Sequence, residues 1–280
     1  MELTHGRAEL EEVTLHYVES GEGPLVVLLH GFPEFWYSWR AQIRALAEDG
    51  FRVVAPDMRG YNRSEKPEGL EAYTRRHLTG DVAQLIAYCG GEEAAVVGHD
   101  WGGVVSWLFA MDHPERLRRL GILNCPHPVV MAGAMKNLRQ VFRAWHMLFF
   151  QLPILPEAAI RLGDFAYMRH IFRSEPVREG AFSEEDIDRY VEAMSRPGAV
   201  RGSLSYYRAA SRHGLIKPLE SITEEVLVVW GEQDNYLGSE YAEPPENLVP
   251  NATVERLPDA SHWVQVDRPE RVNAHLLDFL

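Results

Sequence analysis

Hydrophobic positions recur along the chain with two different periods, and the change of period divides it into three parts. Residues 25–29 form a continuous apolar run, typical of a strand that is buried on both faces. Apolar residues at helical spacing follow, over about 38–49. Similar short runs predict further strands at 52–56, 96–98, 120–123, 226–230 and 254–257. Because helical patterns separate most of these strands, the pattern predicts an α/β protein with a mostly parallel sheet.

The ends of this pattern differ from its middle. Residues 9–19 alternate between apolar and polar and predict an antiparallel hairpin or edge pair. From about 126 to 217 only helical periodicity is found, which predicts a helical insertion. One amphipathic helix is expected through Leu138, Val141, Phe142, Trp145 and Leu148, a looser one through Ile160, Phe165, Met168 and Ile171, and another from Glu184 to Met194 after a Ser183 cap.

The most informative motif is Gly98-His99-Asp100-Trp101-Gly102-Gly103, which lies between a buried strand and an apolar helix. A Gly-x-Ser-x-Gly turn in this setting lifts a nucleophile above the sheet of an α/β-hydrolase. Here the residue at the tip is Asp100. A carboxylate can attack an electrophilic carbon without a base and form an alkyl ester. We therefore expect displacement at carbon rather than acyl transfer by a serine.

Two partners for Asp100 follow in the order usual for this fold, first an acid and then a histidine. Asp234 comes directly after the strand at 226–230, and His262 follows the strand at 254–257. Asn124 ends the intervening strand and cannot serve as the acid. Asp259 adjoins the histidine loop instead of following the preceding strand, and we expect His99 to be a packed residue of the turn.

An oxyanion site is also predicted. His30-Gly31-Phe32-Pro33 begins where the strand at 25–29 ends. The backbone amides of Phe32 and Trp101 could stabilise the tetrahedral intermediate of ester hydrolysis, each donor contributing about 3 kcal/mol.

Composition narrows the function classes. The 28 Lys and Arg against 41 Asp and Glu give a net charge of −13, which predicts no nucleic-acid partner and repulsion from anionic membranes. Cys89 and Cys125 offer no disulfide framework and are expected to be buried thiols. No apolar run has membrane-spanning length, no signal pattern precedes the fold, and no Cys/His cluster has ligand spacing. We expect a cytoplasmic protein without cofactor or metal.

Together these motifs resemble the epoxide hydrolases of the α/β-hydrolase superfamily over essentially the whole chain. The resemblance rests on 30–34 with 36–40, 57–61, 98–103, 124–128 and 262–265. It implies an eight-stranded, mostly parallel sheet in a core of residues 1–127 and 219–280, with a helical cap at 128–218. It also implies the reaction: Asp100 opens an epoxide, and His262, oriented by Asp234, activates the water that releases a vicinal diol.

The resemblance further implies two cap tyrosines that donate hydrogen bonds to the epoxide oxygen and protonate it as the ring opens. Tyr206-Tyr207-Arg208 is similar to the family's aromatic-Tyr-Arg motif, which points to Tyr207. Tyr167 matches the earlier tyrosine more loosely, so Tyr190 or Tyr206 could take one of these roles.

Other functions remain open at this stage. A haloalkane-type dehalogenase shares the aspartate nucleophile, and Trp101 could contact a halide, but Phe32 stands where an asparagine could serve. A non-catalytic ligand-binding scaffold is a further alternative. For an enzyme, we expect a small hydrophobic epoxide and water as partners, and a monomer or homodimer. The predicted pocket is lined by Pro33, Trp101, Trp145, Phe172 and Trp263.

Overall fold

A single twisted sheet organises the protein in the computed structural model, which describes residues 3–214 and 220–280. Its eight strands have the order β1-β2-β4-β3-β5-β6-β7-β8. From β3 to β8 the pairs are parallel, whereas β1 and β2 are antiparallel to each other and β2 is antiparallel to β4. The bounds are β1 Thr4–Glu9, β2 Thr14–Ser20, β3 Leu25–Leu29, β4 Arg52–Pro56, β5 Ala94–His99, β6 Leu117–Leu123, β7 Val226–Gly231 and β8 Ala252–Leu257. The predicted eight-stranded, mostly parallel sheet is confirmed.

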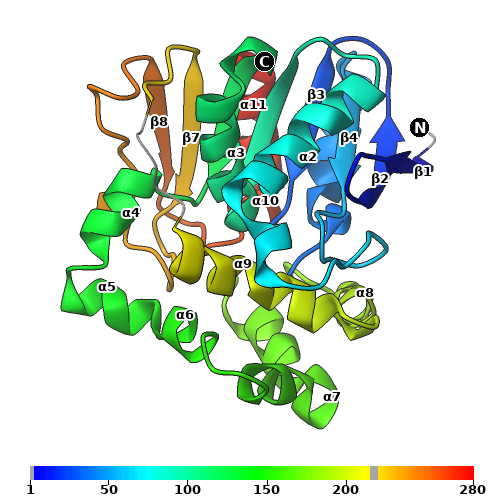
Figure 1. Cartoon of the computed structure of the whole chain (residues 1–280). Helices are drawn as coiled ribbons and strands as arrows, with labels where there is room; N and C mark the ends of the chain where they lie inside the picture. Colours follow the sequence, from blue (N-terminus) through cyan, green and yellow to red (C-terminus); the bar gives the residue numbers. More distant parts are fainter. Residues whose placement is uncertain (1–2, 215–219) are drawn as a thin grey trace.

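Helices cover both faces of this sheet (Figure 1). Val27 of β3 packs into the core cluster that holds the apolar residues of α2 and α3, and the neighbouring Val26 packs into the cluster with α1 and α11. Successive side chains of a strand point to opposite faces, so a continuous apolar run needs both layers. The bounds of the core helices are α1 Arg40–Glu48, α2 Arg75–Tyr88, α3 Trp101–Asp112, α10 Val264–Asp267 and α11 Pro269–Phe279.

The chain between β6 and β7 builds a separate layer of helices. Residues 128–214 form six helices and no strand: α4 Pro128–Ala134, α5 Leu138–Arg143, α6 Trp145–Phe149, α7 Leu155–Ser174, α8 Glu184–Ser195 and α9 Ala199–His213. Figure 1 shows α9 between the sheet and the outer helices α5, α6 and α7. The predicted end of the cap, at residue 218, lies outside the described residues.

Two helix predictions for this layer hold in detail. The helix expected from Glu184 begins after Ser183, whose side chain and that of Asp186 form a reciprocal capping box. The looser helix through Ile160 and Ile171 is α7, and backbone angles at Leu162–Phe165 leave the helical range within it.

The single amphipathic helix expected at 138–148 is wrong. The segment forms α5 and α6, which are separated at Ala144. The Gln140 side chain donates to the Tyr236 carbonyl at 2.7 Å and accepts from the Gly238 amide at 3.2 Å, which ties α5 to the loop after β7. The first strand of the edge pair also begins earlier than predicted, at Thr4.

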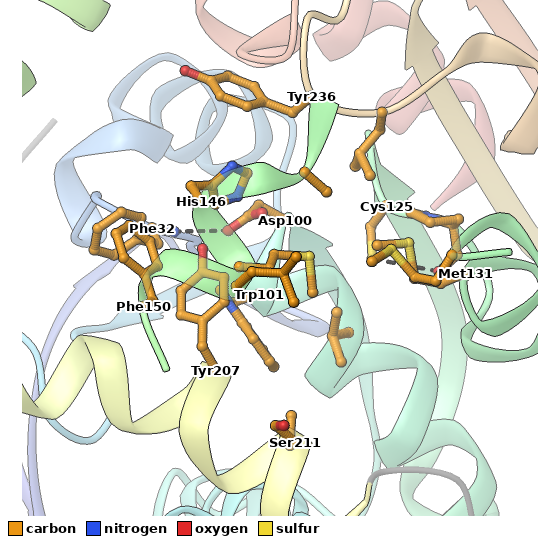
Figure 2. Close-up of a pocket in the computed structure, with 18 of the residues that line it drawn as sticks. Phe32, Asp100, Trp101, Cys125, Met131, His146, Phe150, Tyr207, Ser211 and Tyr236 are labelled. Carbon is orange, nitrogen blue, oxygen red and sulfur yellow. Dashed lines mark hydrogen bonds between the residues drawn. The ribbon is translucent and has the colours of Figure 1, made fainter. Parts of the chain in front are cut away.

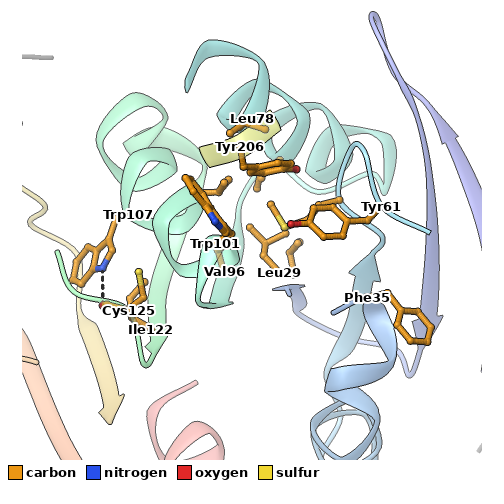
Figure 3. Packing of buried hydrophobic residues seen from close by; sticks show 14 of the residues in the cluster. Leu29, Phe35, Tyr61, Leu78, Val96, Trp101, Trp107, Ile122, Cys125 and Tyr206 are labelled. Carbon is orange, nitrogen blue, oxygen red and sulfur yellow. Dashed lines mark hydrogen bonds between the residues drawn. The ribbon is translucent and has the colours of Figure 1, made fainter. Parts of the chain in front are cut away.

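Tyrosine and tryptophan side chains join the cap to the core. Tyr206 of α9 packs against Tyr61, with ring centroids 5.5 Å apart, and against Trp101 at the same distance (Figure 3). The Tyr206 hydroxyl donates to the carbonyl of Arg59 at 2.9 Å. This contact holds α9 over the carboxyl ends of β3 and β5. Cys89 and Cys125 are buried and unbridged, as predicted.

Candidate active site

Asp100 lies at the tip of a tight turn between β5 and α3. Its φ of 50° and ψ of −118° are strained for a residue with a side chain. A Cβ atom on Gly102 would lie 2.0 Å from the carbonyl oxygen of Leu29, and one on Gly98 would lie 2.3 Å from the carbonyl of Gly102. Only glycines allow the backbone to close this turn, which explains the motif and lifts the carboxylate above the sheet.

The two oxygens of the Asp100 carboxylate have different neighbours. The backbone amide of Phe32 donates to Oδ1 at 2.8 Å, and Oδ2 lies 3.7 Å from Nε2 of His262 (Figure 2). Trp101, whose amide is the other predicted oxyanion donor, is the first residue of α3. One oxygen is therefore held by a backbone donor, while the other faces the imidazole.

Asp234 is held in place on both of its oxygens. Its Oδ2 accepts from Nδ1 of His262 at 2.7 Å and from the Asn124 side chain at 2.8 Å. Its Oδ1 accepts from the amides of Tyr236 and Leu237 at 2.7 and 2.9 Å. These donors fix the carboxylate so that it can orient His262. Asn124 thus contacts the acid, a role that its position at the end of a strand did not reveal.

Charge coupling determines the protonation of these groups. Burial raises the pKa of Asp100, but His262 outweighs burial and leaves it below its usual value. The pKa of Asp234 is likewise raised by burial and lowered more by His262 and Asn124. Burial lowers the pKa of His262, yet the two carboxylates raise it to about 10. The resting site therefore holds two carboxylates and an imidazolium.

The rival residues lie elsewhere. Asp259 is paired with Arg268 at 2.7 Å and Arg271 at 2.8 Å, away from the imidazole. His99 is buried, bonds Glu34 at 2.8 Å and reaches the backbone carbonyl of His262 at 2.9 Å. His99 therefore supports the histidine loop from below, as a packed residue of the turn.

A cavity of about 520 Å³ opens above Asp100, between core and cap. That volume is in the range of sites for small organic ligands. Apolar side chains dominate its wall, among them Phe32, Pro33, Trp101, Met131, Met147, Phe150, Ile171, Leu237 and Trp263. Asp100 and His262 lie at its base, and the Asp100 side chain is 20% exposed, so the carboxylate can meet a ligand.

Tyr167 and Tyr207 both line this cavity from the cap. The hydroxyl of Tyr207 points toward Asp100 (Figure 2), and its ring lies 4.9 Å from that of Trp101. Burial raises the pKa of Tyr207 well above its usual value, so the phenol keeps its proton at neutral pH. Burial also raises the pKa of Tyr167, although this residue is 38% exposed. Tyr190 and Tyr206 are buried and do not line the cavity.

The prediction was wrong for two pocket residues. Trp145 is 54% exposed on the outside of the cap, and Phe172 is packed behind the wall, 4.6 Å from the ring of Tyr190. Neither lines the cavity. An aromatic residue on a helix can face either way, and the sequence did not say which side of the cap is hollow.

Sequence reasoning also missed two polar residues of the cavity wall. His146 of α6 and Tyr236 of the loop after β7 face each other, with ring centroids 5.5 Å apart. Burial lowers the pKa of His146 to about 4, so it is neutral at physiological pH. No motif marks either residue, because each reaches the cavity only through the packing of the cap.

Two further classes of feature were sought in the described residues, 3–214 and 220–280. They hold no cluster of three or more His, Cys, Asp or Glu side chains that could bind a metal ion. None of their helices combines the length and the apolar character needed to cross a bilayer.

Known proteins share this arrangement. The family model described as "alpha/beta hydrolase fold" matches residues 24–269. Epoxide hydrolase 4 of Mus musculus is 38% identical over 95% of this chain and 76% of its own length. The epoxide hydrolase of Bacillus megaterium, crystallised with a diol product, has a TM-score of 0.90 at 34% identity, covering 98% of this chain and 99% of that one. The chain belongs to the epoxide hydrolases of the α/β-hydrolase superfamily.

Other epoxide hydrolases agree. Epoxide hydrolase A of Mycobacterium thermoresistibile has a TM-score of 0.87 at 33% identity and covers all of this chain. The AB hydrolase superfamily protein YfhM of Bacillus subtilis is 40% identical over 96% of this chain and 94% of its own length. The match over nearly the full length includes the cap as well as the core, so the family resemblance seen in the motifs is confirmed.

Proposed function

We propose that the protein converts an apolar epoxide and water into a vicinal diol through an ester on Asp100. The observation that carries this proposal is the placement of a carboxylate and a protonated phenol, Tyr207, in one apolar cavity. An epoxide needs both groups, because its carbon is attacked while its oxygen must gain a proton. Membership of the epoxide hydrolases supports the same conclusion.

In the first step, the free oxygen of Asp100 forms a bond to an epoxide carbon and the carbon–oxygen bond of the ring breaks. Tyr207, assisted by Tyr167, donates the proton that the departing alkoxide requires. The product of this step is an ester of Asp100 that carries a neighbouring hydroxyl group. We assign the cap function to residues 128–218, which supply both tyrosines.

In the second step, water attacks the ester carbonyl. Esterification removes the negative charge that lies 3.7 Å from the imidazole of His262 and that helps to keep its pKa high. The imidazole then loses its proton more easily and can act as the base for water, oriented by Asp234. The amide of Phe32 already donates to Asp100 and remains in place for the oxyanion, together with that of Trp101. Collapse of the intermediate releases the diol.

A dehalogenase would use the same nucleophile, but a departing halide needs no proton. The apolar cavity then gives the two phenols no task. Incubation with styrene oxide and, separately, with a bromoalkane of similar size distinguishes these reactions. We expect diol from the first and no bromide from the second; bromide release without diol formation would overturn the proposal.

A further inference from the structure

The outer surface of the cap carries apolar residues that the fold leaves uncovered. Leu138, Phe142, Trp145 and Leu148 follow one another at helical spacing along α5 and α6, and their exposed fractions are 73%, 77%, 54% and 59%. This is the stripe that the sequence pattern predicts as the buried side of an amphipathic helix. The stripe exists, but it faces solvent. We call these four residues the outer cap stripe.

The segment that follows extends the same property. Leu152, Ile154 and Leu155 are 44%, 77% and 60% exposed. Large apolar side chains that gather on a surface in this way mark an interaction site more often than chance exposure. In Figure 1, α5 and α6 lie at the outer margin of the cap, away from the sheet, where a broad partner could reach them.

The charge of this surface is opposite to that of the whole chain. Residues 126–156 contain Lys136, Arg139 and Arg143 but no aspartate or glutamate, in a protein with a net charge of −13. No carboxylate in the described part of the chain forms an ion pair with these three cations. Nearby Arg208, by contrast, is paired with Glu157 at 2.6 Å. A local cationic surface is therefore set beside the stripe, although net charge alone predicts repulsion from anionic membranes.

We propose that the outer cap stripe docks the protein on an anionic phospholipid surface. Trp, Phe and Leu on one side of a segment and Lys and Arg beside them are the combination that places a peptide in the lipid headgroup region. Each cation close to such a surface strengthens binding about fivefold. A second copy of the chain fits less well, because an interface built on this patch would bring the same cations together from both subunits.

Docking would place the substrate cavity beside the lipid. Ala144, Met147 and Leu148 of the same segment line the cavity, and Leu148 is exposed on the outside as well. An apolar molecule dissolved in the bilayer would then be separated from Asp100 by the α5–α6 segment alone. The docking itself does not depend on the proposed reaction.

Flotation of the full chain with lipid vesicles tests the proposal without any epoxide. We expect binding to vesicles of phosphatidylcholine mixed with phosphatidylglycerol, and at least tenfold weaker binding to phosphatidylcholine alone. The double variant Phe142→Gln/Trp145→Gln should lower binding to mixed vesicles at least tenfold, because both side chains are more than half exposed and remote from the catalytic groups.

A pair of charge variants of equal net charge supplies the control. Arg139→Gln/Arg143→Gln should lower binding about 30-fold. Arg44→Gln/Arg271→Gln, which changes exposed arginines of α1 and α11, should leave it unchanged. The proposal is wrong if the wild type does not float with anionic vesicles, or if both pairs lose binding equally. It is also wrong if the wild type sediments as a dimer that Phe142→Gln/Trp145→Gln dissociates, since the stripe is then a subunit interface.

Discussion

The carboxyl edge of the sheet and the cap hold their functional groups in different ways. Asp234 accepts four hydrogen bonds, two of them from backbone amides, and is buried. Tyr167 of the cap follows a break in α7 and is 38% exposed. The contrast teaches that the core carries the covalent chemistry on positions that cannot shift, whereas the cap adds leaving-group contacts and an outer surface that are less constrained.

The largest effect is expected at the core. Asp100→Asn replaces the nucleophile by an amide whose oxygen can still accept from the Phe32 amide, so the fold should be kept. Because the amide cannot form the ester, we expect diol formation to fall about 10⁴-fold or more. Turnover is measured with styrene oxide, and thermal unfolding controls for stability. Retention of a tenth of the activity would show that another group opens the ring.

The two cap tyrosines should rank by their burial. Tyr207→Phe removes a buried donor aimed at Asp100, and we expect kcat/KM to fall about 100-fold to 1,000-fold. Tyr167→Phe, at a partly exposed position, should cost about tenfold. Tyr206→Phe is the matched control, since its hydroxyl bonds the Arg59 carbonyl and not the cavity. Its removal should cost about 1 kcal/mol of stability and leave kcat unchanged. The reverse ranking would reassign the proton donor.

Stability should separate core from cap as well. Ile122 is fully buried in β6, so Ile122→Ala should lower the free energy of unfolding by about 3 kcal/mol. Phe142→Ala in the outer cap stripe should change it by less than about 0.5 kcal/mol. Urea unfolding of both variants measures the difference. An equal cost would mean that Phe142 is covered in solution.

The smallest effect concerns pH. The pKa of Asp100 is below its usual value, so ring opening should not change between mildly acidic and neutral pH. Hydrolysis needs a neutral His262, and the raised pKa means that this form is gained as pH rises and lost as pH falls. The ester should therefore accumulate on acidification, about tenfold per pH unit at most. Rapid quenching followed by mass spectrometry counts the esterified chains; a constant fraction would argue against His262 as the base.

How far the sequence predicts this molecule follows the same division. The apolar run at 25–29 is a strand with those bounds because only a strand covered on both faces suits five consecutive apolar residues. Strand ends also place Asp234 and His262 correctly beside each other. In the cap, periodicity finds the helices but not their orientation. Trp145 therefore faces outward, and His146 beside it in sequence enters the cavity unannounced.

The most direct test of the account is to trap the ester. In His262→Gln the nucleophile and the Tyr207 donor are intact, but the base that activates water is missing. After incubation with styrene oxide, mass spectrometry of digested protein should find the added mass of one substrate on the peptide that contains Asp100. The wild type, sampled at steady state, should show much less of it. An unmodified Asp100 in the variant, or the added mass on a different residue, would contradict the central claim that this carboxylate bonds to the substrate.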